Sequence, residues 1–278
     1  MEILKKIHLV DPKLIPQLIS QKTKAIVPMD YGGISCKINE IQEVAKNNNL
    51  VLIEDSAEAL GASINGKKVG STADLSIFSF CGNKVLTTGE GGAIVTNDKT
   101  VFEKIKLIRS HGRMDTVRYF DNTEQSQYLE LGYNWRMSSI TAALGLSQIS
   151  KLDKLIKMRQ ENAEYISKAL SKFPEIITPS SKNGSEHIYQ MYTIRLSNKD
   201  VRDKLHDFLT KKLIFSKVYF NPIHLTDFYR NKFGTKVNSL LVTELISQQI
   251  LTIPLYPNMN LEEKKYLTDS ISEFFDSV

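Results

Sequence analysis

Cysteine and long apolar runs are both scarce in this sequence of 278 residues. Only Cys36 and Cys81 are present, so the sequence predicts neither a disulfide framework nor a metal site built on paired C-x-x-C units. No stretch approaches the ~20 consecutive apolar residues of a membrane-spanning helix, and no apolar run follows the first residues. We therefore expect a reduced, cytoplasmic protein that is neither exported nor inserted into a membrane.

A concentrated basic surface is also missing. Lysine and arginine number 36 against 31 acidic residues, and the lysines occur in scattered pairs such as Lys67-Lys68 and Lys211-Lys212. Binding to a phosphate backbone needs a basic cluster, so nucleic acid is not an expected partner, whereas a small anionic substrate suits this balance. The glycine-rich run at residues 89–92 departs from G-x-G-x-x-G, so dinucleotide binding is not supported.

What the sequence does contain is the alternation typical of an α/β protein. Hydrophobic residues make up 41% and charged residues 24%, as in soluble globular domains. Apolar strand-like runs alternate with a helical spacing between residues 24 and 90, which predicts a mostly parallel sheet with helices on both faces. The expected elements here are strands at 25–28, 50–53, 75–80 and 92–96, a helix at 38–47 and a hairpin turn at Asn65-Gly66.

The second half of the sequence has a different pattern. Ser138 is a candidate N-cap for one long helix reaching about Leu170. The pattern then predicts strands at 191–196 and 215–219, a helix at 199–211 and a terminal helix from Leu261. We expect two domains: a large one over residues 1–150, and residues 151–278 with the connecting helix and a small α+β domain.

Lys84 is the first candidate catalytic residue. It lies between two predicted apolar strands, where burial would make its amine a usable nucleophile for Schiff-base chemistry. A solvated loop lysine is the alternative interpretation. Cys81 lies nearby without an obvious histidine base in the sequence, so a cysteine hydrolase is not indicated.

Asp55 is the second candidate, because it follows a buried strand at the edge where open α/β sheets bind ligands. A buried carboxylate needs a cationic partner or several donors to stay charged. The protonated pyridine nitrogen of pyridoxal phosphate (PLP) would be such a partner, and an aspartate opposite it makes PLP an electron sink. Asp55 and Lys84 are the two anchors that this chemistry requires.

Several segments resemble the DegT/DnrJ/EryC1/StrS family of PLP-dependent nucleotide-sugar aminotransferases. The family's Glu-Asp-x-Ala-x-x-x-Gly pattern is found at residues 54–61, Ser-Phe-x-x-x-Lys at 79–84 and Thr-Gly-Glu-Gly-Gly at 88–92. A segment similar to Gly-x-Asn-Tyr-Arg-Met stands at 132–137, and the C-terminal signatures match at 219–224 and 251–255. Five motifs in the right order carry more weight than any single one.

The resemblance implies an aspartate-aminotransferase-like (type I) fold and a role for each matching residue. Lys84 would hold PLP as a Schiff base and shuttle a proton during catalysis. Asp55 would pair with the pyridine nitrogen, Ala57 would pack on a face of the ring, and Glu58 would lie near the ring hydroxyl. Ser79 would donate to the cofactor phosphate.

The resemblance also implies a homodimer with shared active sites. Asn134, with Arg136 behind it, would reach the phosphate of the cofactor in the neighbouring subunit. Tyr219 and His224 would line the sugar pocket. Structural interpretations stay open: Ser79 bonding to backbone, Asn134 capping the long helix, Arg136 in a surface ion pair, and Tyr219 and His224 packed in the core.

The activity implied is transamination of a nucleotide-linked keto-deoxysugar with an amino acid donor, glutamate in the family, for surface polysaccharide or glycan biosynthesis. Residues 82–84 are most similar to the branch that makes perosamine from GDP-4-keto-6-deoxymannose. Two alternatives remain: a truncated homologue that only binds or dimerises, and a PLP-dependent sugar dehydratase. Lys84 argues against the dehydratase, because that group carries histidine at this position.

Family members begin with a sizeable segment ahead of the position that corresponds to Met1, and we expect this segment to be lacking. In the family it supplies a phosphate-binding helix N-terminus and an aromatic side chain stacked on the ring. Its loss would leave an open sheet edge and exposed apolar surface. A misassigned start codon, a split gene and a degenerate copy are the three explanations.

Overall fold

A four-stranded, mostly parallel sheet organises the first half of the protein. The computed structural model describes residues 9–113, 127–181 and 184–277. The strands lie in the order β1-β2-β5-β6; their bounds are β1 (Ala25–Ile26), β2 (Val51–Asp55), β5 (Leu75–Ser79) and β6 (Gly92–Thr96). β1, β2 and β5 run parallel and β6 is antiparallel to β5, which confirms the predicted sheet.

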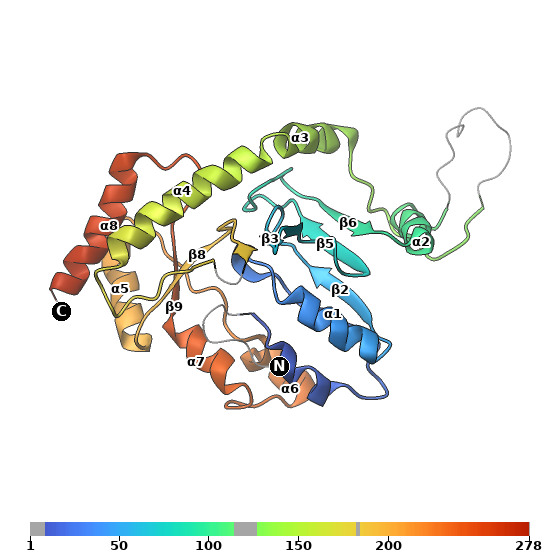
Figure 1. The fold of residues 1–278 in the computed structure, drawn as a ribbon, viewed down its shortest axis with the longest axis horizontal. Helices are drawn as coiled ribbons and strands as arrows, with labels where there is room; N and C mark the ends of the chain where they lie inside the picture. Colours follow the sequence, from blue (N-terminus) through green and yellow to red (C-terminus); the bar gives the residue numbers. More distant parts are fainter. Residues whose placement is uncertain (1–8, 114–126, 182–183, 278) are drawn as a thin grey trace.

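Two helices pack against this sheet (Figure 1). Helix α1 (Ile38–Asn47) contacts β2 and buries Ile38, Ile41 and Ala45, the spacing of one helical face. Helix α2 (Lys99–Arg109) contacts β6 and begins at Asp98, whose carboxylate accepts hydrogen bonds from the N–H groups of the first turn.

The predicted hairpin is confirmed and ties the two halves of the chain together. Strands β3 (Ser63–Ile64) and β4 (Lys67–Lys68) pair antiparallel around Asn65 and Gly66. Both turn residues have positive φ, 51° and 78°, which an Asn-Gly pair tolerates and a two-residue hairpin requires. β7 (Ser185–Glu186) pairs with the other side of β3, so a segment more than 100 residues away completes this small sheet.

The single long helix expected from Ser138 to Leu170 is wrong: the structure has two helices, α3 (Ser139–Ile149) and α4 (Leu152–Leu170). Ser138 is the N-cap, as expected, since its hydroxyl accepts a hydrogen bond from the third helical residue. The break falls at Ser150, whose hydroxyl donates to the carbonyl of Ser147 and so competes with the helical ladder. Figure 1 shows the change of direction between the two helices.

Beyond α4, helices pack around a two-stranded antiparallel sheet. The elements are β8 (Tyr192–Arg195), β9 (Ile250–Ile253), α5 (Lys199–Lys211), α6 (Asp227–Phe233), α7 (Leu241–Gln249) and α8 (Leu261–Asp276). The strand expected at 215–219 is wrong, because only an isolated bridge between Lys217 and Thr252 forms there. Pro222, which has no N–H to donate, follows shortly afterwards.

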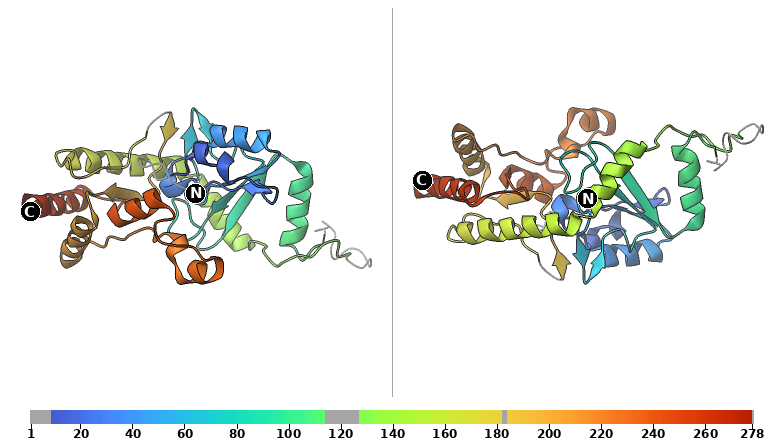
Figure 2. Two further views of the ribbon diagram at one scale, coloured as in Figure 1. Left: turned by 90° about the horizontal axis from the view of Figure 1, so that it is seen from below. Right: turned by 90° about the horizontal axis from the view of Figure 1, so that it is seen from above.

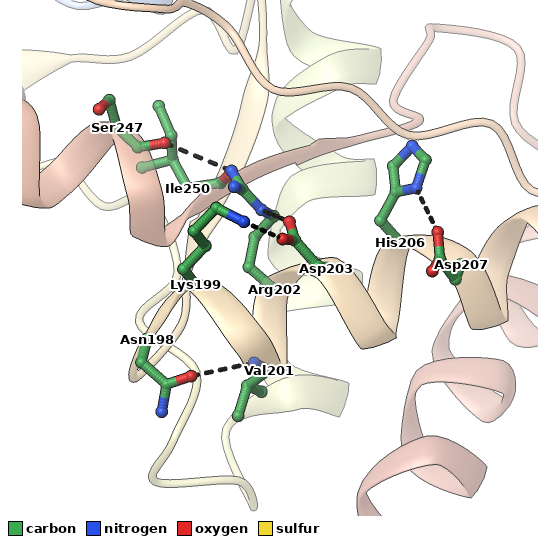
Figure 3. A network of polar contacts seen from close by, with 9 residues as sticks. All are labelled: Asn198, Lys199, Val201, Arg202, Asp203, His206, Asp207, Ser247 and Ile250. Carbon is green, nitrogen blue, oxygen red and sulfur yellow. Dashed lines mark hydrogen bonds and ion pairs between the residues drawn. The ribbon is translucent and has the colours of Figure 1, made fainter.

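A buried arginine joins two of these helices (Figure 3). Arg202, in the first turn of α5, donates to the carbonyls of Ser247 and Ile250 at the end of α7. Carbonyls at a helix C-terminus have no partner within the helix, so the guanidinium satisfies groups that would otherwise be buried unpaired. Asn198 caps the start of α5 by accepting from the N–H of Val201.

Among the described residues the hydrophobic core has three clusters, two of which each come from one stretch of the chain, while the third joins residues 59–85 to Ile156 and Ile188. One cluster of buried side chains draws all its members from residues 163–274, and a second draws its members from residues 9–52. Both views in Figure 2 show α5 and α8 at the opposite end of the molecule from α2. We propose a domain boundary at the break between α3 and α4, next to the limit at residue 150 expected from the sequence. Within the described residues, no helix has the length and apolarity to span a membrane.

Candidate active site

Lys84 lies in a compact loop that connects β5 to β6. Its N–H donates to the carbonyl of Cys81, which closes a turn, and the N–H of Thr88 returns to the carbonyl of Phe80. Val85 and Leu86, which follow the lysine, are buried and anchor the loop in the protein. The Lys84 side chain is only 14% exposed, so the solvated-loop interpretation is wrong.

Glu58 is the ionic partner of the lysine. Its Oε1 lies 3.4 Å from Lys84 Nζ, and its Oε2 accepts a hydrogen bond of 2.9 Å from the N–H of Gly32. The carboxylate side chain is 8% exposed. Glu58 thus bridges the turn at residues 31–33 and the lysine amine, a contact that the sequence motif alone did not predict.

Asp55 is the last residue of β2, at the carboxyl end of the parallel strands, as the sequence predicted. Its Oδ1 accepts a hydrogen bond of 3.1 Å from the N–H of Ala57, and its backbone carbonyl accepts from Asp30. The side chain is partly exposed, so the second carboxylate oxygen has room for a ligand. Ala57 is also partly exposed beside it.

Ser79 ends the neighbouring strand β5, two residues beyond Ile77, the residue that pairs with Asp55. Its hydroxyl accepts a hydrogen bond of 3.3 Å from the N–H of Cys81. This is the backbone contact that the structural interpretation anticipated. It occupies one lone pair of the hydroxyl and leaves its proton available for an anionic ligand.

A pair of fully buried carboxyl groups, Asp30 and Glu54, lies behind this edge of the sheet. Asp30 accepts from the hydroxyl of Ser56, and Glu54 Oε2 accepts from the N–H of Gly70 and the hydroxyl of Ser76. Burial and then the charge of Asp30 raise the pKa of Glu54 to about 7, and burial raises the pKa of Asp30 as well. Two buried carboxyls without a cation retain a proton near neutral pH.

Asn134 and Arg136 lie on the segment that leads into α3. Asn134 forms a β-bridge with Ser110, and Arg136 Nη1 donates to the Ser110 hydroxyl at 3.1 Å. Both residues are exposed, and these contacts place them beside the end of α2. Capping of α3 by Asn134 is wrong, because Ser138 is the cap.

Tyr219 and His224 line a cavity of about 430 Å³ together with Tyr31. The hydroxyl of Tyr31 donates to the carbonyl of Tyr219 at 2.6 Å, and Gly32, the next residue, binds Glu58. The cavity is therefore lined by the first residue of the turn at 31–33, which holds the partner of the lysine. His224 Nε2 is already engaged by Glu244 Oε1 at 2.9 Å, so this imidazole presents only part of its hydrogen-bonding capacity to a ligand.

Sequence reasoning missed Asp30, Tyr31 and Arg159. Arg159 offered a signal, because it falls on the apolar stripe of α4 between Ile156 and Ala163, where a charged residue calls for buried partners. Tyr31 and Asp30 offered none, since their contacts depend on segments brought together only by folding. Among the described residues, no group of three or more His, Cys, Asp or Glu is placed to hold a metal ion.

An enclosed lysine amine at the carboxyl edge of a mostly parallel sheet defines, with this fold, an aminotransferase of the type I class. The chain is matched over residues 1–272 by the model of the DegT/DnrJ/EryC1/StrS aminotransferase family, and it belongs to that family. This confirms the resemblance found in the sequence motifs.

Two relatives show how far the similarity extends. The chain is 34% identical over 261 residues to a GDP-perosamine synthase of Escherichia coli O157:H7, covering 94% of this chain and 68% of the relative. It is 36% identical over 273 residues to a UDP-4-amino-4,6-dideoxy-N-acetyl-beta-L-altrosamine transaminase of Campylobacter jejuni, covering 96% and 70%.

A solved structure gives the same result. Helicobacter pylori PseC, an aminotransferase involved in the biosynthesis of pseudoaminic acid, superposes with a TM-score of 0.92 at 32% identity. The match covers 100% of this chain and 74% of that protein. The predicted type I fold is therefore confirmed.

Proposed function

We propose that the protein transfers an amino group from an amino acid to a nucleotide-linked keto-deoxysugar, with PLP as cofactor. The observation that carries the proposal is the lysine amine of Lys84, enclosed at the sheet edge 3.4 Å from Glu58. Burial favours the neutral amine that Schiff-base chemistry requires, whereas an exposed lysine is a solvated ammonium. Family membership supplies the reaction class.

The residues at this edge fit the chemical groups of PLP. Lys84 offers the primary amine that would bind the aldehyde, and Asp55 offers a partly exposed carboxylate for the pyridine nitrogen. Ala57 presents a small side chain for a ring face, and Ser79 retains a hydroxyl proton for the phosphate. The chemistry that PLP supplies when bound is the transfer of an amino group from a donor to a keto carbon.

Each residue has a distinct part in the reaction. Lys84 Nζ holds the cofactor and afterwards carries the proton to and from the substrate carbon. Glu58 Oε1 orients that amine, and its backbone partner Gly32 fixes the carboxylate. Tyr219 and His224 line the cavity proposed for the sugar. The imidazole of His224 is hydrogen-bonded to Glu244.

Glutamate is the proposed donor, as in the family. The proposed acceptor is GDP-4-keto-6-deoxymannose, favoured by residues 82–84 and by the name of the E. coli relative, a GDP-perosamine synthase. The Campylobacter relative is named for a UDP-linked sugar, so a direct comparison of GDP- and UDP-linked keto-sugars as acceptors decides between the two nucleotides. Biosynthesis of a surface polysaccharide or glycan is the proposed setting.

The proposed working unit is a homodimer in which Asn134, with Arg136 behind it, reaches the cofactor phosphate of the neighbouring subunit. Both residues are exposed beside the end of α2, which supports a role toward another copy. Helix α3, which follows them, exposes large apolar side chains such as Ile140 and Leu146.

The decisive experiment is the visible absorption spectrum of the purified protein mixed with PLP. We expect a band of lysine-bound cofactor in the intact protein that bleaches when glutamate is added. Lys84→Ala should lack the band, whereas Lys67→Ala, which removes an exposed lysine from strand β4, should retain it. An intact protein without the band would favour the alternative, a homologue that binds or dimerises without catalysis.

A further inference from the structure

The loop that carries Lys84 is hydrogen-bonded on both sides of the lysine by one side chain from the second half of the sequence. Gln190 Nε2 donates to the carbonyl of Asn83 at 2.8 Å, and Gln190 Oε1 accepts from the N–H of Val85 at 2.8 Å. These two peptide groups flank Lys84 on either side. The NH₂ group of Gln190 therefore meets the loop's carbonyl acceptor, and its carbonyl oxygen meets the loop's N–H donor. This pairing fixes the orientation of the amide.

Gln190 is itself held rigidly. It is 7% exposed, and its backbone carbonyl accepts from Arg159 Nη2 at 2.9 Å, while Arg159 Nε donates to the carbonyl of Tyr189 at 2.9 Å. Desolvation lowers the pKa of Arg159 to about 10, so the guanidinium stays charged at neutral pH. A charged donor forms stronger hydrogen bonds than a neutral one, which secures the backbone from which Gln190 projects.

The same segment also holds the partner of the lysine. The N–H groups of Ile188 and Met191 donate to the carbonyls of Gly33 and Gly32, and the N–H of Gly32 binds Glu58. Gly33 has φ +105°, and a Cβ there would stand 2.7 Å from the N of Gln190, so only glycine permits this approach. One segment therefore positions both the lysine loop and the turn that binds Glu58.

We infer that Gln190 is a positioning residue for Lys84: through Asn83 and Val85 it sets where the amine stands relative to Glu58. Reactive groups must be held within a fraction of an ångström of their working geometry by neighbours that are themselves fixed. This inference rests on the proposed role of Lys84, but not on any particular substrate.

The test compares Gln190→Leu with Gln190→Glu. Leucine removes both hydrogen bonds, whereas glutamate keeps the acceptor for Val85 and loses the donor to Asn83. Gln249→Leu is the matched control, because Gln249 is equally buried at 9% and also makes two bonds, from Arg195 Nε and to the carbonyl of Ser197, in the C-terminal region.

Two readouts are taken on the full chain without cofactor: hydrogen exchange of the Val85 amide, and the rate at which trinitrobenzenesulfonate labels Lys84 at each pH, located by mass spectrometry. In Gln190→Leu we expect Val85 protection to fall by about fivefold or more and the labelling profile of Lys84 to shift along the pH axis. Gln190→Glu should keep the Val85 protection while shifting the labelling profile. Gln249→Leu should change neither.

A labelling profile that is unchanged in both Gln190 variants overturns the inference, and so does an equal shift in Gln249→Leu, which would reveal only general loosening. If Gln190→Leu does not fold by circular dichroism, the Gln190→Glu profile decides. Because neither readout needs PLP, a protein that never binds the cofactor would contradict the proposed function while leaving the positioning role measurable.

Discussion

Two buried glutamates, one at the active-site edge of the sheet and one in the C-terminal region, are ionised differently. Glu244 accepts from His224 and from the N–H groups of Asn238 and Leu240, and these donors lower its pKa to about 2. Glu54 accepts hydrogen bonds from only two donors and lies beside the buried carboxyl of Asp30. Its Oε1 has no partner among the described buried atoms, and its pKa is raised to about 7.

The same contrast extends to the surroundings of the two glutamates. In the C-terminal region a continuous cluster of buried side chains surrounds β8 and β9, and Arg202 satisfies the end of α7. The sheet region instead has a buried acid pair, Asp30 and Glu54, and Glu54 Oε1 lacks a partner among the described buried atoms. Glu244 in the C-terminal region is thus matched by donors and stays ionised, whereas the buried acid pair of the sheet region retains a proton near neutral pH.

The largest expected effect is that of truncating a buried leucine. Leu205 on α5 is fully buried, while Leu131, ahead of α3, is 79% exposed. Leu205→Ala should lower the free energy of unfolding by about 2–5 kcal/mol, because burial is lost and a cavity remains. Leu131→Ala should change it by less than about 0.5 kcal/mol. Urea unfolding monitored by circular dichroism measures both, and equal losses would show that the two regions do not differ in packing.

The acid pair predicts a pH dependence of stability. Because the pKa of Glu54 is raised on folding, the stability it contributes is complete below its ordinary pKa of 4.5 and is lost as pH rises through about 7. A pKa moved from 4.5 to about 7 corresponds to about 3 kcal/mol. Asp30 and the Cys36 thiol are the titratable groups that face this carboxyl.

Glu54→Gln should therefore reduce the fall in the free energy of unfolding between about pH 5 and about pH 7.5, the range over which Glu54 ionises. Glutamine keeps an acceptor for Gly70 and Ser76 and adds an N–H donor toward Asp30. Glu244→Gln is the control with the opposite sign: the pKa of Glu244 is lowered, so its contribution is lost only as pH falls through about 2. Urea titrations at the two pH values measure the slopes, and an unchanged slope in Glu54→Gln would contradict the role of the pair.

The exposed apolar side chains of α3 predict a surface that a second copy of the chain covers. Ile140 is 86% exposed and Leu146 is 72% exposed, and a helix with apolar residues around its circumference is normally buried. If a second copy covers α3, Ile140→Asp and Leu146→Asp should weaken self-association by about tenfold or more, or about 1.4 kcal/mol. Sedimentation velocity across a dilution series measures this. Lys211→Asp, an exposed change on α5, is the control and should leave association unchanged.

The two residues proposed to hold the cofactor, Asp55 and Lys84, could be predicted because short stretches of sequence identify them. Asp55 ends a strand and Lys84 lies in the loop after β5, both inside short motifs, so strand prediction, residue type and the family motifs were enough to single them out. The hairpin at Asn65-Gly66 was predictable for the same reason, since two residues with positive φ determine it. The mostly parallel sheet was predictable from the alternation of apolar runs and a helix, but its strand order was not predicted.

The arrangement around the lysine was not accessible, because it depends on contacts between distant segments. Gln190 meets the Lys84 loop more than 100 residues away, and nothing near Gln190 in the sequence marks it as a partner. Glu58 belonged to a recognised motif, yet its contact with Lys84 depends on how the two loops converge. The break after α3 was missed because hydroxyl-to-carbonyl bonds at Ser150 outweighed an apolar periodicity that continues across it.

The smallest expected effect concerns the bond that joins the two regions. Tyr31, in the turn that binds Glu58, donates from its hydroxyl to the carbonyl of Tyr219 at 2.6 Å. Tyr31→Phe should lower the free energy of unfolding by about 1 kcal/mol, because a partly buried carbonyl loses its donor. Tyr229→Phe alters the wall of the same cavity and is the control. Equal losses in the two variants would mean that the hydroxyl bond contributes nothing specific, and that the sheet region and the C-terminal region are joined here by packing alone.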